Sequence, residues 1–80
     1  MSFAVVYDWP ALATLYNRID WRTASDIDAA VHRFAATRAA TMAPAPAYRL
    51  RTAGYDVVLA IDSATRVVTV LRLYQARSPR

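Results

Sequence analysis

The side chains best suited to chemistry in this sequence are arginines that gather between residues 48 and 80. Six arginines and two aspartates, Asp56 and Asp62, lie in that stretch, whereas four arginines cancel four aspartates in residues 1–47. The whole formal net charge of +4 therefore belongs to the C-terminal part of the chain. Lysine and glutamate are absent, and the planar guanidinium fork matches the geometry of phosphate oxygens. The stretch predicts binding to a polyanion such as nucleic acid, or to an acidic protein surface.

Three consecutive strands are expected to position these arginines, within the segment from Tyr48 to Arg77. Ala53 and Gly54 predict a tight hairpin turn, because glycine adopts the positive φ that such turns need. Side chains alternate between the two faces of a strand, so this turn would place Arg51 opposite Asp56 on one face.

A second turn is expected around residues 62–66. It would pair Ile61 with Val67, Leu59 with Thr69, Val57 with Leu71, and Asp56 with Arg72. Asp56 would then lie between two arginines. The predicted open face carries Arg49, Arg51, Asp56, Val58, Val68, Val70, Arg72 and Tyr74. The predicted helix-covered face carries Tyr55, Val57, Leu59, Ile61, Val67, Leu71 and Leu73.

The first half of the chain predicts one strand and two amphipathic helices. The strand covers Phe3–Tyr7, one helix covers Pro10–Ile19, and the second covers Thr23–Arg38 with a capping box between Thr23 and Asp26. Prolines in Thr41–Ala47 predict a stiff, extended connector. The helical stripes consist of Leu12, Leu15, Tyr16 and Ile19, and of Ile27, Ala30, Val31, Phe34 and Ala35. A helical hairpin on an antiparallel sheet gives a single α+β domain, residues 1–80, of order β-α-α-β-β-β.

Composition excludes several kinds of site. The chain has no cysteine, so disulfides and thiolate metal sites are excluded. No zinc spacing or phosphate loop is present, so neither a metal nor a cofactor is expected. His32 is the only histidine and is interpreted as an ordinary helix residue, while Trp9 and Trp21 are interpreted as packing anchors or partner-facing aromatics. Asp8 interrupts the early apolar run and no run is long enough to span a membrane, which favours a cytoplasmic protein without membrane contact.

Three stretches of the sequence resemble the RelE/ParE superfamily of type II toxins. FAVVYDWPALATL is similar to the opening strand and helix of that family, YRLRTAGYDVVLAID to its YRLR-x-x-x-YR-V-x-Y-x-I pattern, and VVTVLRLYQAR to its closing strand. The resemblance covers nearly the whole chain and implies the same α+β fold. It also implies a toxin that is held silent by a cognate antitoxin, in a heterotetramer or a higher complex.

The resemblance implies two different targets. RelE-like members act as mRNA interferases: they cut messenger RNA on the ribosome, inhibit translation and arrest growth, whereas ParE-like members inhibit DNA gyrase by binding. RNA cleavage by attack of a 2′-hydroxyl on the adjacent phosphate needs a group that activates the hydroxyl, cations around the phosphate and an acid for the leaving oxygen.

The resemblance places Arg49, Arg51 and Arg77 at basic positions of the family's site, with Arg77 at or one position after its C-terminal arginine. Asp56 stands where the family usually has arginine, and Gln75 stands where it often has histidine or lysine. No tyrosine follows Gln75, although the RelE branch has one. These departures leave two alternatives to the nuclease, namely a ParE-like inhibitor and a non-catalytic interaction module.

The candidate catalytic residues are Arg49, Arg51, Asp56 and Arg77, and the candidate residues for binding nucleic acid or a partner are Arg49, Arg72, Tyr74, Arg77 and Arg80. Arginine keeps its proton at ordinary pH, so the arginines would stabilise charge. Asp56 has two interpretations: an ion-pair tether between strands, or a substitute carboxylate base. Tyr74 would offer a ring on which a base can stack.

Overall fold

The computed structural model describes residues 3–42 and 45–76. Its elements are β1 (Ala4–Tyr7), α1 (Trp9–Asn17), α2 (Trp21–Thr37), a short 3-10 helix η1 (Ala39–Thr41), β2 (Ala45–Thr52), β3 (Tyr55–Asp62) and β4 (Val67–Gln75). The sheet has the strand order β1-β4-β3-β2. β2, β3 and β4 form the expected antiparallel meander, and β1 joins β4 in parallel. The α+β class and the element order are confirmed, with a mixed sheet.

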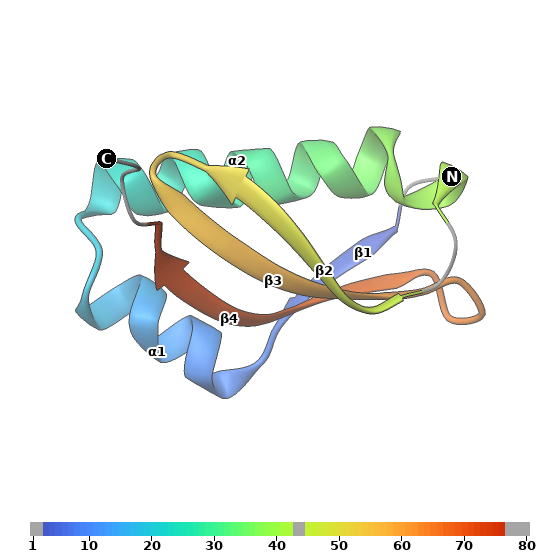
Figure 1. Ribbon diagram of the computed structural model, residues 1–80, viewed down its shortest axis with the longest axis horizontal. Coiled ribbons are helices and arrows are strands. Elements are labelled where there is room, and N and C mark those ends of the chain that lie inside the picture. Colours follow the sequence, from blue (N-terminus) through green and yellow to red (C-terminus); the bar gives the residue numbers. More distant parts are fainter. Residues whose placement is uncertain (1–2, 43–44, 77–80) are drawn as a thin grey trace.

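Both helices lie on one side of the sheet and leave the other side uncovered. Figure 1 shows α1 and α2 joined by a short turn at one end of the molecule, with the end of β2 and the turn into β3 in front of part of α2. The strands turn their apolar side chains toward the helices because alternate residues of a strand point to opposite faces. We call the uncovered side the open face.

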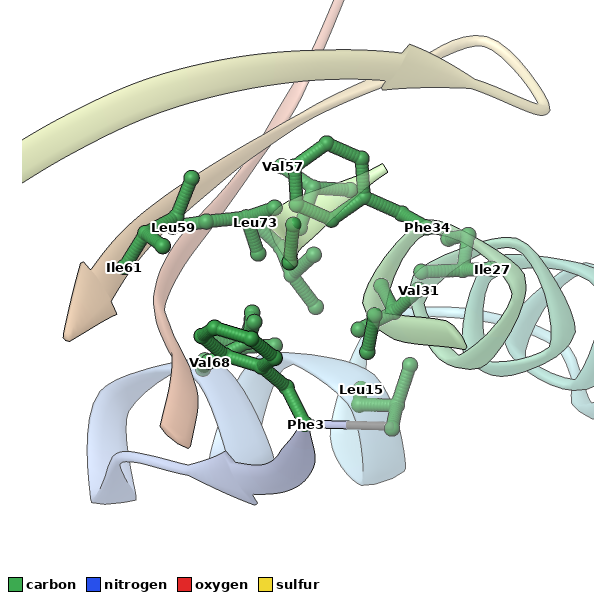
Figure 2. Close-up of a cluster of buried hydrophobic side chains, with 14 of the residues drawn as sticks. Phe3, Leu15, Ile27, Val31, Phe34, Val57, Leu59, Ile61, Val68 and Leu73 are labelled. Carbon is green, nitrogen blue, oxygen red and sulfur yellow. The ribbon is translucent and has the colours of Figure 1, made fainter. Parts of the chain in front are cut away.

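The core is a single cluster between the helices and the sheet. Leu15 of α1, Phe34 of α2 and Val57 of β3 are buried in it, and Figure 2 shows these side chains among those that fill the space between the layers. Ile27 and Leu59 are among the largest side chains with no exposed surface. No polar or charged side chain of the described residues is buried in this core. The fold therefore depends on apolar burial.

The start of α2 and the buried face of α1 differ from the sequence prediction. α2 begins at Trp21 with Asp20 as its N-cap, whose carboxylate accepts a hydrogen bond of 3.2 Å from the backbone N–H of Thr23. The predicted capping box at Thr23 is therefore wrong, because the cap lies three residues earlier and Thr23 is its donor. In α1, Tyr16 was expected in the buried stripe, yet it is 76% exposed. The α1 stripe that faces the sheet is narrower than predicted.

The first hairpin has the predicted register. Arg51 pairs with Asp56, and the pairing continues to Arg49 opposite Val58. Ala53 and Gly54 adopt φ angles of 51° and 80°, as a turn with two left-handed residues requires. The sequence identified both the turn and the faces correctly.

The second hairpin has a different register. Asp62 pairs with Val67, one position away from the expected pairing, and a bulge shifts the register again at Leu71. Val68 and Val70 therefore point into the core with no exposed surface, instead of lying on the open face. After the bulge the alternation is restored, so Arg72 and Tyr74 do lie on the open face and Leu73 is buried. A bulge inserts one extra residue into a strand. The residues before it therefore point to the opposite face from the one that strict alternation predicts.

The connector Thr41–Ala47 is shorter than predicted. Thr41 ends the short η1 helix and β2 begins at Ala45, while residues 43 and 44 lie outside the described part of the chain.

Within the described residues, no helix is long and apolar enough to cross a membrane.

Candidate functional site

Two rows of side chains cross the open face from β2 to β4. In one row, Asp56 of β3 lies between Arg51 of β2 and Tyr74 of β4. In the second row, Val58 of β3 lies between Arg49 and Arg72. Successive rows on one face of a sheet are about 7 Å apart. The expected neighbours Arg49, Arg51, Asp56, Arg72 and Tyr74 are therefore brought together, but in a different arrangement from the predicted one.

Arg51 and Asp56 form the ion pair of the first row. The Nε atom of Arg51 donates to Oδ1 of Asp56 at 3.1 Å. The Arg51 side chain is 65% exposed, whereas that of Asp56 is 13% exposed. The pair holds Asp56 against the sheet and cancels one positive charge of the open face, and Asp56 remains an acceptor because a carboxylate has further lone pairs.

Arg72 is opposite Val58, not opposite Asp56 as the sequence predicted. The turn register and the bulge at Leu71 each shift the pairing by one residue, so Arg72 lies one row further along the sheet than predicted. Its Nη1 atom donates to the backbone oxygen of Leu71 at 2.9 Å. Among the described residues, neither Arg49 nor Arg72 has an aspartate within ion-pair distance. Both charges are therefore available to an anion.

The second row places two arginines on either side of a short apolar residue. Arg49 and Arg72 are both exposed, and their Cα atoms are separated by two strand spacings, which is about 10 Å. Val58 between them is short, so the two long side chains can converge above it. Two guanidinium groups that converge on one point suit a phosphate, which accepts several hydrogen bonds from planar donors.

Tyr74 supplies the aromatic ring of the first row. It is 53% exposed and lies directly opposite Asp56. An exposed ring next to cationic side chains is the arrangement on which nucleic-acid bases stack. Gln75, the next residue, is exposed and ends β4. Arg77 and Arg80, the remaining candidates, lie outside the described residues.

A second polar cluster lies away from the open face and was not anticipated. The Tyr7 hydroxyl donates to Oδ1 of Asp28 at 2.7 Å, and Nδ1 of His32 lies 3.4 Å from the same oxygen. Burial and the hydrogen bond to Asp28 raise the pKa of Tyr7 well above its ordinary value. His32 was interpreted as an ordinary helix residue, but it has a carboxylate partner in Asp28, which lies one helical turn before it.

The described residues contain no group of three or more histidine, cysteine or acidic side chains that could hold a metal ion. The two rows instead offer three cations, one carboxylate and one ring. This arrangement can neutralise a phosphate and can accept one proton.

A comparison of the chain with protein-family models finds no match, and a comparison with curated proteins finds none either.

Proposed function

We propose that the chain is the toxin of a type II toxin-antitoxin system, of the RelE/ParE kind, and that it inhibits translation by ribosome-dependent cleavage of messenger RNA. The observation that supports this proposal most is the row of Arg49, Val58 and Arg72 beside the row of Arg51, Asp56 and Tyr74. The row of Arg49, Val58 and Arg72 suits a phosphate, and the row of Arg51, Asp56 and Tyr74 supplies a carboxylate and a ring about 7 Å away along the strands.

The proposed chemistry uses few groups. Asp56 accepts the proton of the 2′-hydroxyl, whose oxygen forms a bond to the adjacent phosphorus while the bond from phosphorus to the 5′-oxygen breaks. Arg49 and Arg72 stabilise the additional charge on the phosphate oxygens, and water protonates the leaving oxygen. Tyr74 holds a neighbouring base by stacking. Arg51 orients Asp56 through their 3.1 Å contact.

The proposed partner is a cognate antitoxin that covers the open face. An acidic or extended protein segment fits a basic face flanked by the edge strand β2, because strand edges accept further backbone pairing. Covering the face would exclude RNA and silence the toxin.

The proposal is tested by expressing the chain alone in its host, with and without the neighbouring open reading frame. We expect growth arrest without the partner, and cleavage of messages at ribosome-protected codons in primer-extension mapping. Combined Arg49→Ala and Arg72→Ala substitutions should restore growth, whereas Arg33→Ala, an exposed arginine on α2, should not. Arrest with intact messages would contradict RNA cleavage, and normal growth with folded protein would favour a non-toxic interaction module.

The second candidate function is ParE-like inhibition of DNA gyrase by binding. One observation favours it: Asp56 is already engaged by Arg51 at 3.1 Å and its side chain is only 13% exposed, so little of the carboxylate is accessible to a substrate hydroxyl. Inhibition by binding needs no base. Supercoiling by purified gyrase should then fall as the protein is added, and unchanged supercoiling at saturating protein would exclude this candidate.

A further inference from the structure

The helical hairpin exposes three large aromatic side chains that the proposed function does not use. Trp9 and Trp21 are each 74% exposed and Tyr16 is 76% exposed. Trp9 and Tyr16 are seven residues apart on α1, so they lie on the same side of that helix. We call Trp9, Tyr16 and Trp21 the aromatic patch. Exposed aromatic groups of this size commonly mark an interaction surface.

A groove opens within the aromatic patch, between α1 and α2. Its volume is about 480 Å³, and its apolar lining consists of Leu12, Leu15, Tyr16, Ile19, Trp21 and Ala24. Asp28 and the Tyr7 hydroxyl that donates to it form a polar end of the groove. A groove of this size accepts an aromatic side chain from a partner.

The net charge of the helical half of the molecule indicates which kind of partner can bind the aromatic patch. Residues 1–47 contain four arginines and four aspartates, so the helical half is neutral, unlike the basic strand region. Charges of both signs border the patch: Arg22 stacks on Trp21 with its guanidinium carbon 5.3 Å from the ring centroid, and Asp28 lines the groove. In a two-fold interface the patch of one copy contacts the same patch of the other copy. A neutral surface that carries one charge of each sign is therefore complementary to its own copy.

We propose that the aromatic patch is the interface of a two-fold homodimer, in which aromatic side chains of one copy enter the groove of the other. Three exposed rings on each of two copies supply on the order of 1,000 Å² of buried surface, which is about the threshold for a specific interface. The dimer would use the helical side and leave the open faces of both copies accessible. This proposal is independent of the proposed toxin activity.

The test is sedimentation equilibrium of the full chain, with Tyr16→Ser and Trp21→Ser as the test variants. Both residues are highly exposed in the monomer, so the variants should fold, which circular dichroism checks. The matched control is Tyr74→Ser, which removes an exposed tyrosine from the open face. We expect a concentration-dependent dimer for the wild type and for the control, and dimerisation weakened at least about tenfold in each test variant.

Intrinsic fluorescence gives a second measurement. The chain has two tryptophans, Trp9 and Trp21, and both belong to the patch. Their emission should shift to shorter wavelength as the wild type is concentrated, with little dependence on salt because the patch is neutral. A wild type that stays monomeric up to about 0.5 mM would overturn the proposal, because such weak association is outside the range of specific interfaces. So would a dimer that Tyr74→Ser weakens while Tyr16→Ser and Trp21→Ser do not.

Discussion

At the scale of single residues, the arginines of the strand region divide into two groups. Arg51 is engaged by Asp56 at 3.1 Å, whereas Arg49 and Arg72 lie beside Val58. The sequence indicated that Asp56 would tether Arg72 as well. The shifted turn and the bulge together separate Asp56 from Arg72, so the open face retains more available positive charge than the predicted register allowed.

A double-mutant cycle tests this division. We expect Arg51→Met and Asp56→Asn to show a coupling of about 0.2 to 1 kcal/mol in the free energy of unfolding, the usual range for a partly exposed ion pair. The control cycle combines Arg72→Met with Asp56→Asn and should show no coupling. Urea denaturation provides the free energies, and a coupling confined to Arg72 and Asp56 would contradict the observed register.

Asp20 provides a second test at this scale, through pH. The hydrogen bond from Thr23 lowers the pKa of the Asp20 carboxyl below its ordinary value. The folded state therefore favours the ionised carboxylate. This preference stabilises the protein above the unfolded pKa of about 4, and the stabilisation is lost as the pH falls below that value. Asp20→Asn retains a capping oxygen, so its melting temperature should fall less than that of the wild type between pH 5 and about 3. An identical pH profile for the two proteins would refute this role.

At the scale of elements, the turn between β2 and β3 can be improved. Ala53 adopts a φ of 51°, which costs a residue with a Cβ atom about 1 kcal/mol, whereas asparagine tolerates this region. We expect Ala53→Asn to raise the free energy of unfolding by up to about 1 kcal/mol in urea denaturation. Gly54→Ala should lower it by a similar amount, for conformational reasons alone, because nothing lies within 4 Å of the added Cβ atom. A stabilising Gly54→Ala would show that the turn has a different conformation in solution.

The two hairpins also show what the sequence could and could not predict. The first hairpin was predictable because Gly54 fixes the turn and the alternation of Leu50, Arg51, Asp56 and Val57 permits one register. The register of the second hairpin was not predictable, because the run Val67 to Leu71 has apolar residues on both faces and Thr69 as its one polar residue, so alternation cannot reveal where the bulge lies. Tyr16 was misplaced for a similar reason: its spacing fits the buried stripe, and only the packing of α1 on β4 shows that it faces away.

At the scale of the whole molecule, function and association are expected on opposite sides. The open face of the sheet carries the basic residues Arg49, Arg51 and Arg72, and the helical side carries the aromatic patch in a neutral setting. Binding at the two sides should therefore respond differently to salt, since screening weakens charge attraction but not apolar burial.

The salt dependence of RNA binding tests this separation. We expect the affinity for a short labelled single-stranded RNA, measured by fluorescence anisotropy, to fall with salt, and each phosphate-contacting arginine to contribute about 0.7 to the slope of the logarithmic plot. Arg49→Gln and Arg72→Gln should each reduce the slope by about that amount, whereas Arg33→Gln on α2 should leave it unchanged. If instead the three variants lowered the slope equally, the attraction would come from net charge alone, and the row of Arg49, Val58 and Arg72 would not be the phosphate-binding site.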